Sequence, residues 1–330
     1  MLKETPTLQT VTPQSIGLSK AATTAPGWSR RKCGKGWTFF DASGERLQGK
    51  ARQRCLELAI PPAWQDVWIA PSSKAHIQVL GTDEVGRRQY IYHPIWLERR
   101  NLAKFESLIA FANCLPRIRK RVRTMLQAPQ TQHDLAVASV ISLLDEGSLR
   151  LGSPEHRKRT GAIGATTLMS KHITLCSDHL ELDYPGKGGK MRHVEVEDED
   201  LTSAMQTLLA DRPRNVFRQE EIRVSPDTIN SVLKDMTGTR FTAKHFRTWN
   251  GSVAASEWLH RHPDQASIKA ISEAAADELG NTPAISRSSY IHPRIIESAS
   301  TPPDFECAGP TRLRASERRC YWLITEYAGV

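Results

Sequence analysis

The sequence lacks the features that mark several classes of protein. Its six cysteines include no CxxC pair, and no histidine lies at zinc-finger spacing from one of them, so neither a disulfide framework nor a zinc finger is indicated. No apolar run reaches the roughly 18 residues that a membrane-spanning helix needs. The first 27 residues also lack the apolar core of a signal peptide. We therefore expect free thiols, no membrane association and a soluble protein of the cytoplasm.

What the chain does have is length, apolar residues and positive charge. Its 330 residues are 39% hydrophobic, which is enough to bury a core and suggests about two domains. The formal net charge is +9 and the pI is about 9.3. Such an excess favours an anionic partner, of which nucleic acid is the commonest. Charge that serves only solubility is the alternative, and composition alone leaves it open.

The N-terminal part divides into a tail and a β-rich domain. Residues 1–27 are rich in Thr, Ser, Pro and Ala and predict a disordered tail. Residues 28–98 contain the runs WTFFD, DVWIA, HIQVLG and QYIYH, which are aromatic or β-branched and separated by Gly, Pro and Asp. This pattern predicts short strands. One helical stretch, GKARQRCLELAI, stops at Pro61-Pro62.

The character of the chain changes near residue 99. Apolar residues then recur at helical spacing, and the expected helices lie in KFESLIAFANCL, HDLAVASVISLL, SAMQTLLA, SPDTINSVLKDM, TAKHFRTWNGSVAASEWLHR and SIKAISEAAADEL. Between them TLMSKHITL, HLELDY and MRHVEVE predict a small sheet. We expect an α+β protein, with a linker near 98–103, a mostly helical domain over 103–300 and an extension of unknown role over 301–330.

Five residues of the larger domain have the chemistry to cleave and reseal a phosphodiester without a metal ion. That reaction needs a nucleophile, permanent cations over the non-bridging oxygens, a neutral donor and an acid for the leaving oxygen. Arg150 follows an apolar helix, Lys171 ends a probable strand, and Arg247 lies within a helix. Asn281 and Tyr290 stand in GNTPAISRSSY. All five lie at edges of expected elements, so they could converge.

Taken singly, each of these residues also has an ordinary structural explanation. In a chain with 45 Lys and Arg, an arginine or a hairpin lysine is usually a solvated surface residue. Asn281 could end a helix after Gly280 or begin a turn, and Tyr290 could be a core tyrosine with one satisfied hydroxyl. The chemical interpretation depends on the joint order of the five residues and on their local contexts.

The motifs RxG, TLxxKH, KxxRTW, GNTP and SxxYI, in this order, resemble the small type IB DNA topoisomerases of bacteria and poxviruses. The N-terminal stretches GKGWTFFDASGERL, LAIPPAWQDVWIAP and HIQVLGTDEVGRRQYIYHPIW also look like that family. The resemblance covers residues 28 to about 295. It implies the catalytic fold that these enzymes share with tyrosine recombinases, and relaxation of supercoiled DNA through cleavage, strand rotation and religation.

The resemblance also implies a role for each of the five residues. Tyr290 would be the nucleophile that forms a 3′-phosphotyrosyl bond, and Arg150 and Arg247 would stabilise the charged transition state. Lys171 would be the general acid for the 5′-hydroxyl. Asn281 matches the bacterial form of a position that is histidine in poxvirus enzymes. The chain has no Walker-type motif and no carboxylate cluster in the matched motifs, so we expect no ATP, no metal ion and no cofactor.

Further residues are expected to contact DNA. Tyr90 and Tyr92 share one face of an alternating strand with Gln89 opposite, although a packed sheet face would look similar. The stretch GKGGK is either a turn that contacts the DNA backbone or a solvated hairpin, and the sequence favours neither interpretation over the other. The full set of expected contacts is Arg87, Arg88, Gln89, Tyr90, Tyr92, Lys187, Lys190 and Lys244. The partner would be double-stranded DNA in the bacterial nucleoid, enclosed by one chain acting as a monomeric clamp.

Two alternatives compete with this interpretation. A tyrosine recombinase shares the catalytic set, but it usually has HxxR at the second arginine and a helical N-terminal domain. This chain has Lys244-His-Phe-Arg247 and a β-rich N-terminal domain, which favours the topoisomerase. A non-catalytic DNA-binding homologue is the other alternative, and the intact set of five residues argues against it.

Overall fold

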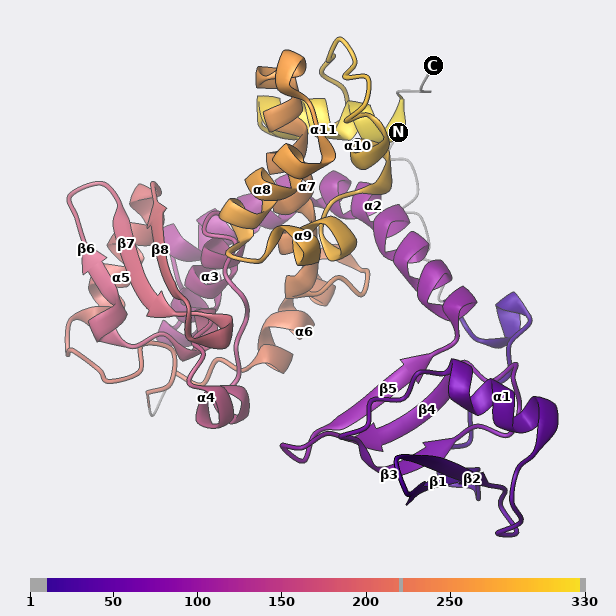
Figure 1. Ribbon diagram of the computed structural model, residues 1–330. Coiled ribbons are helices and arrows are strands. Elements are labelled where there is room, and N and C mark those ends of the chain that lie inside the picture. The colour runs from indigo at the N-terminus through magenta and orange to yellow at the C-terminus, as the bar shows by residue number, and fades with distance from the viewer. Residues whose placement is uncertain (1–10, 220–221, 327–330) are drawn as a thin grey trace. The chain divides into compact units, whose positions relative to one another are not determined.

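The structure is a computed structural model that describes residues 11–219 and 222–326 (Figure 1). The described residues form two compact units, which divide between Lys104 and Phe105. Both mix helices with small antiparallel sheets, so the α+β class that the sequence predicts is confirmed. The first ten residues of the expected tail lie outside the described residues.

The first unit is built from two small antiparallel sheets and one helix. Four of its five strands contain a β-branched or aromatic run that ends near a turn residue, whereas the first strand has the polar sequence SRRKC. A hairpin joins β1 to β2, and the other sheet has the order β3-β4-β5. The elements are β1 (Ser29–Cys33), β2 (Gly36–Phe40), α1 (Gly49–Glu57), β3 (Gln65–Ile69), β4 (Ile77–Thr82) and β5 (Arg88–Tyr92).

The core of this unit is small and is supplemented by an arginine. Its main apolar cluster consists of the buried residues Phe39, Cys55, Ile60, Ile69 and Val79. From β1, the guanidinium group of Arg30 donates hydrogen bonds to the carbonyl oxygens of Ile60, Pro61 and Trp64 at 3.0, 2.6 and 3.0 Å. These bonds satisfy the main chain of a loop whose two prolines offer no amide donors.

The segment 11–27 is ordered, so the expectation of a disordered tail is wrong for this part. Leu18 is buried in the first unit. The amide of Ser19 donates to the carbonyl of Lys74 at 2.9 Å, and the amide of His76 donates back to Ser19 at 2.9 Å. The composition of the segment suggests disorder because it offers little apolar surface. Main-chain pairing with residues distant in the sequence supplies the stabilisation that composition does not reveal.

The long helix α2 (Pro94–Gln127) passes through the expected linker. Residues 98–103 are helical and form no separate linker, although the two units divide between Lys104 and Phe105, beside the predicted position. Pro94 suits the first turn of a helix because its missing amide hydrogen would have no intrahelical acceptor. No glycine follows it within the helix, and the next proline is Pro116, so nothing in the sequence interrupts the first turns.

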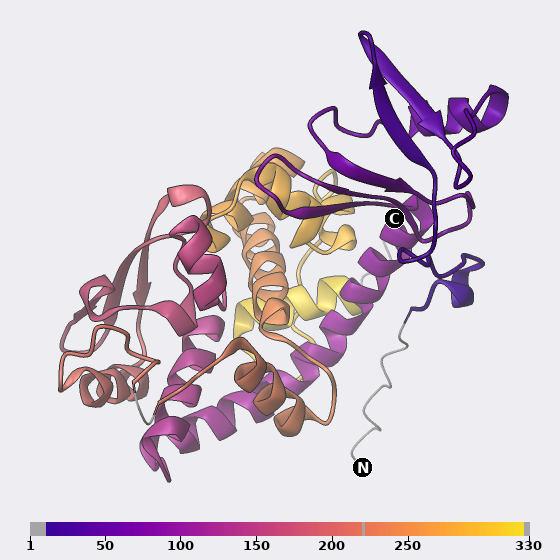
Figure 2. The same ribbon diagram turned by 90° about the horizontal axis from the view of Figure 1, so that it is seen from below.

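The second unit is mostly helical, and the helices expected from apolar spacing are present. Figures 1 and 2 show its helices gathered beside the β6–β8 sheet, which lies at one side of the unit. The helices are α3 (Gln132–Asp145), α4 (Pro154–Thr160), α5 (Glu199–Leu209), α6 (Pro226–Thr237), α7 (Ala243–Arg261), α8 (Ile268–Leu279), α9 (Pro283–Ser289), α10 (Pro293–Glu297) and α11 (Ala315–Thr325).

The sheet of this unit is a three-stranded antiparallel meander. Its strands are β6 (Ile173–Leu175), β7 (Leu180–Pro185) and β8 (Met191–Val196). The turn between β7 and β8 contains the short 3-10 helix η4 (Lys187–Gly189). Gly188 and Gly189 both have positive φ, at 75° and 76°, a conformation that glycine adopts without steric cost. GKGGK therefore forms a turn between β7 and β8, and its contact with DNA stays a prediction.

Helix α7 lies at the centre of the second unit and packs against α3, α8 and α11. Among the largest fully buried side chains, Phe246 and Trp249 come from this helix. Ser267 caps the start of α8 by accepting a hydrogen bond from the Ala270 amide at 3.2 Å. Helix α11 lies in the extension 301–330 and joins the same core. The C-terminal extension thus supports the helix that carries Arg247.

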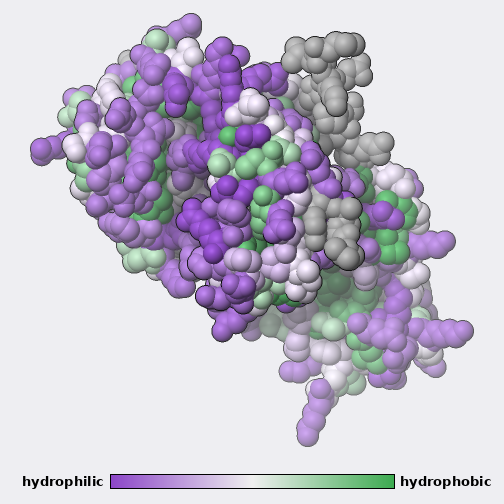
Figure 3. Space-filling view, turned by 90° about the horizontal axis from the view of Figure 1, so that it is seen from above, coloured by the Kyte–Doolittle hydropathy of each residue, from purple (hydrophilic) through white to green (hydrophobic). Residues whose placement is uncertain are grey.

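Hydrophilic residues dominate the face of the molecule in Figure 3, with apolar residues scattered between them. In the described part of the chain, every helix is too short or too polar to cross a membrane.

Candidate active site

Arg150 stands in a tight connection that follows α3. Ser148 has a positive φ of 52°, and Asn250 of α7 holds it by donating from Nδ2 to the Ser148 hydroxyl at 2.8 Å and to the carbonyl of Asp145 at 2.7 Å. The carbonyl of Arg150 accepts the Ala165 amide at 2.8 Å. These bonds fix the backbone on both sides of Arg150, and its side chain is directed to the end of α8.

Arg247 is almost completely buried, with 4% of its surface exposed. Its Nη1 donates to the carbonyl of Ser148, and its Nη2 donates to the carbonyl of Leu279 at 2.8 Å. The last carbonyls of a helix have no intrahelical donor and carry partial negative charge. Arg247 therefore joins the connection after α3 to the end of α8.

Asn281 brings the two arginines together. Helix α8 ends at Gly280, which has the left-handed φ of 54°, and the Asn281 amide donates back to Ala276 at 3.0 Å. The side-chain oxygen of Asn281 accepts hydrogen bonds from Nη2 of Arg150 and, at 3.4 Å, from Nη2 of Arg247. Its Nδ2 is buried and has no partner in the described part of the chain.

Tyr290 lies beside this group at the end of α9. Its carbonyl accepts the Ser252 hydroxyl of α7 at 3.0 Å, and the Cζ atom of Arg247 lies 5.4 Å from the centroid of its ring. The side chain is partly exposed. A Cβ atom at Gly251 would come within 3.2 Å of Tyr290 Cβ and 2.8 Å of Leu279 Cδ1, so glycine lets the tyrosine approach α7.

The electrostatics of the site favour an anion. Burial, followed by the neighbouring charge of Arg150, lowers the pKa of Arg247 to about 10. Burial likewise lowers the pKa of Arg150. In the described part of the chain neither arginine forms an ion pair with a carboxylate. Two desolvated cations that share one neutral acceptor would be stabilised by a negatively charged ligand.

Lys171 is not brought into this group. It lies on the short 3-10 helix η3 (Ser170–His172), immediately before β6, and its side chain is exposed. The expectation that it ends a strand is wrong, because His172 bonds back to Met169 in a turn and the ladder begins only at Ile173. Within the described residues, no hydrogen bond or ion pair joins Lys171 to the other four.

The lysines of the β7–β8 turn lie closer to the site. Lys187 and Lys190 are exposed and line a cavity of about 260 Å³ together with Gly280 and Asn281. The sequence predicts these lysines only as DNA contacts. Their approach to Asn281 depends on how the sheet packs beside α8, which no local motif reveals.

Sequence reasoning missed Arg192 of β8, which lines the same cavity. Its Nη1 and Nη2 donate to the carbonyls of Asp277 and Glu278 at 3.0 and 3.1 Å, so it caps the end of α8 that bears Asn281. Its charge adds to that of Arg150 and Arg247. A lone arginine in an alternating strand gives no sequence signal of such a role.

The other expected DNA contacts are exposed or partly exposed. Tyr90 and Tyr92 stack on one face of β5, with ring centroids 5.8 Å apart, as strand alternation predicts. On the first unit, Arg87 pairs with Asp83 at 2.7 Å and Gln89 donates to the same carboxylate at 2.8 Å. The remaining cations, Arg88 on β5 and Lys244 in the first turn of α7, are exposed.

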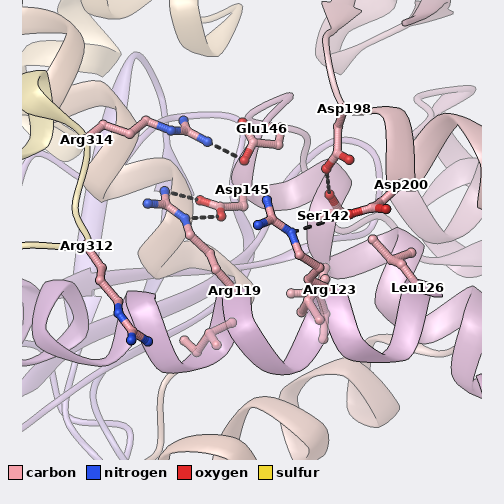
Figure 4. A pocket seen from close by; sticks show the side chains of 13 residues that line it. Arg119, Arg123, Leu126, Ser142, Asp145, Glu146, Asp198, Asp200, Arg312 and Arg314 are labelled. Atoms are coloured by element: carbon pink, nitrogen blue, oxygen red, sulfur yellow. Dashed lines mark hydrogen bonds and ion pairs between the residues drawn. The ribbon is translucent and has the colours of Figure 1, made fainter. Parts of the chain in front are cut away.

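A separate cavity of about 200 Å³ lies between α2, α3 and the C-terminal extension (Figure 4). Its polar lining includes Arg119, Asp145, Glu146 and Arg314, which pair among themselves. None of the five predicted catalytic residues lines it. Its charges are already compensated, in contrast to those around Asn281.

Comparison with known proteins gives a consistent result. A family model described as the eukaryotic DNA topoisomerase I catalytic core matches residues 95–289, and one described as the N-terminal domain of bacterial DNA topoisomerase IB matches residues 36–83. DNA topoisomerase 1B of Acanthamoeba polyphaga mimivirus is 24% identical over 286 residues, covering 81% of this chain and 85% of the relative.

DNA topoisomerase 1B of vaccinia virus (strain Copenhagen) is 24% identical over 228 residues, covering 66% of this chain and 71% of the relative. Among solved structures, the XerH site-specific recombinase bound to a palindromic difH substrate aligns with 17% identity and a TM-score of 0.36. That alignment covers 67% of this chain and 59% of the recombinase, and at this TM-score it carries no argument.

Proposed function

The chain belongs to the type IB DNA topoisomerase family, and we infer that it relaxes supercoiled DNA by breaking and rejoining one strand. The observation that carries this inference is the arrangement of Arg150 and Arg247, which share the oxygen of Asn281 beside Tyr290 and have no carboxylate partner in the described residues. A phosphodiester is an anion of the size and charge that this group can bind.

We propose the following roles for the cleavage step. The Tyr290 hydroxyl oxygen attacks phosphorus, forming the phosphotyrosyl bond on the 3′ side while the bond from phosphorus to the 5′ oxygen breaks. The tyrosine loses its proton and the departing oxygen gains one. Arg150 and Arg247 stabilise the charge that develops on the non-bridging oxygens. The unpartnered Nδ2 of Asn281 donates a hydrogen bond to one of them.

Religation reverses the same step. The free 5′-hydroxyl attacks the phosphotyrosine, so the energy of the original phosphodiester is conserved and the reaction needs no ATP. Between the two steps the broken strand rotates about the intact one. Rotation has no preferred direction, so positive and negative supercoils are both relaxed.

We propose that the proton donor for the 5′ oxygen is a lysine of the β7–β8 turn. Lys187 and Lys190 share a cavity with Asn281. Lys171, the candidate from the sequence, is exposed and forms no hydrogen bond or ion pair with the other four residues in the described part of the chain. A lysine can serve as an acid when neighbouring cations lower its pKa, and Arg192 lines the same cavity.

A panel of lysine variants tests this assignment. Lys187→Ala, Lys190→Ala and Lys171→Ala are compared on DNA with an ordinary 5′-bridging oxygen and on DNA with sulfur at that position. We expect one hairpin variant to cleave ordinary DNA about 10²–10⁴-fold more slowly and to recover on the sulfur substrate, whose leaving group needs no proton. Recovery of Lys171→Ala alone would return the role to Lys171.

We also propose that one chain encloses a double-stranded DNA segment as a monomeric clamp in the bacterial nucleoid. The exposed cations and the stacked Tyr90–Tyr92 pair of the first unit would contact the duplex, together with Lys244 of the second unit. Binding of this kind depends mainly on phosphate contacts and has weak sequence demands.

Plasmid relaxation tests the proposed function. The purified chain is incubated with positively and with negatively supercoiled plasmid in EDTA without ATP, and both are expected to relax. Sedimentation of the chain on a short duplex, run alongside, should give one chain per duplex, with affinity that falls steeply as salt rises. Relaxation of one sign only, or a requirement for magnesium or ATP, would contradict the proposal.

A further inference from the structure

The far end of the β6–β8 sheet holds a group of metal-ligating side chains. Cys176 and His179 flank the turn between β6 and β7, and the Cys176 amide closes the turn by donating to the His179 carbonyl at 3.0 Å. Ligand atoms of Cys176, His179 and Glu181 all lie within 4.8 Å of one another. The three residues lie in the turn before β7 and at the start of that strand. The GKGGK turn, which lines the cavity with Asn281, follows the opposite end of β7. The group is therefore distinct from the catalytic site.

A fourth donor comes from the neighbouring strand. Glu181 of β7 pairs directly with Glu195 of β8 in the sheet register, so their side chains share one face. The Nε2 atom of His179 lies 3.8 Å from a carboxylate oxygen of Glu181 and 3.7 Å from one of Glu195. Thiolate, imidazole and two carboxylates form the donor set of a tetrahedral zinc site.

The histidine is oriented as a metal ligand would be. Its Nδ1 lies 2.9 Å from Oδ1 of Asp178, and a carboxylate that accepts the Nδ1 proton leaves the lone pair of Nε2 free. This is the outer carboxylate–histidine arrangement that commonly positions zinc-bound histidines. Nε2 is also the atom that faces Glu181 and Glu195, so the free lone pair points to the remaining donors.

The charge of the group favours a cation. In the described part of the chain no lysine or arginine forms an ion pair with Glu181 or Glu195, which lie side by side. A divalent ion would relieve the repulsion between the carboxylates and stabilise the thiolate.

We propose that Cys176, His179, Glu181 and Glu195 bind one Zn²⁺ ion, with Asp178 orienting the histidine. The ion would tie the β6–β7 turn to β8 and stiffen the sheet that presents Lys187 and Lys190. It takes no part in strand cleavage. The sequence does not indicate this site because no zinc-finger spacing is present and the sheet register supplies the last ligand.

The test is metal binding by the whole chain, reduced and freed of metal with a chelator. Co²⁺ serves as a spectroscopic probe, and Zn²⁺ is then added in competition. We expect one equivalent of Co²⁺ to give thiolate-to-cobalt charge transfer and tetrahedral d–d bands, which Zn²⁺ abolishes. Cys176→Ser should remove the thiolate band, and His179→Gln should remove the tetrahedral bands.

Two further variants sharpen the result. Asp178→Asn should weaken binding by about 10–100-fold while the spectrum is retained, as expected of an outer partner of a ligand. Cys307→Ser, at an exposed cysteine outside the group, is the control and should bind as the natural chain does. Circular dichroism confirms that each variant is folded. Absence of the thiolate band in the natural chain, or equal binding by the Cys176 and Cys307 variants, would overturn the proposal.

Discussion

The Tyr290→Phe variant is expected to bind supercoiled DNA as the natural chain does and to relax none of it. The change removes only the phenolic oxygen. The ring keeps its place beside Arg247, and the hydrogen bond from the Ser252 hydroxyl to the Tyr290 carbonyl is unaffected. The fold and the cationic site are therefore retained while the nucleophile is lost. We expect a loss of more than about 10⁴-fold, of the order found when other enzymes lose a catalytic nucleophile.

Two measurements check this expectation. Plasmid relaxation in EDTA reports turnover, and denaturation of the reaction with detergent traps any protein joined to a labelled DNA strand. The natural chain should give both relaxed plasmid and a covalent adduct at a 3′ end. Tyr321→Phe, in α11, is the control and should behave as the natural chain.

Other outcomes would be equally informative. An adduct formed by Tyr290→Phe would identify a different nucleophile. If the natural chain and the variant both bind DNA but neither relaxes it, the non-catalytic alternative gains support. If the natural chain forms an adduct and also exchanges strands between two duplexes, the recombinase alternative gains support.

The regular elements of the fold could be predicted from the sequence because their signals are local. Apolar residues at helical spacing predict α8. The capping residues Ser267 and Gly280 indicate where this helix begins and ends. Other features depend on distant partners. The segment 11–27 is ordered by pairing with residues 74–76, and residues 98–103 continue a helix although the charge and composition change there.

The candidate site was predictable to a similar degree. The family motifs contain Arg150, Arg247, Asn281 and Tyr290, and the structure brings these four together. Their roles stay predictions until they are tested. Motif order could not identify Arg192, because its function as a cap arises only where β8 meets the end of α8.

A second large effect is expected from Glu317, a buried carboxylate in the C-terminal extension. It is 3% exposed and accepts hydrogen bonds from Arg119 of α2 at 2.8 and 2.7 Å and from Trp249 Nε1 of α7 at 3.1 Å. Figure 4 shows Arg119 bonded to Asp145 of α3 as well. One ion network therefore links three helices to the extension.

Glu317→Ala is expected to lower the free energy of unfolding by about 3–5 kcal/mol, because it leaves Arg119 with one carboxylate instead of two and Trp249 without its acceptor. Urea unfolding at pH 7 measures the change. Glu326→Ala, at an exposed glutamate just after the same helix, is the control and should change the free energy by less than about 0.5 kcal/mol. Equal values for the two variants would show that the network contributes little.

The pH dependence of this difference distinguishes a charged network from simple packing. Burial alone would raise the pKa of Glu317, but hydrogen bonds from Arg119 and its charge outweigh burial and hold the pKa below the ordinary value of 4.5. A carboxyl whose pKa is lower in the folded state stabilises fully above its unfolded pKa and loses that contribution as pH falls through the folded value. The gap between the natural chain and Glu317→Ala should therefore be constant near neutral pH and shrink below about pH 4.5. A gap that persists unchanged in acid would instead assign the stabilisation to packing.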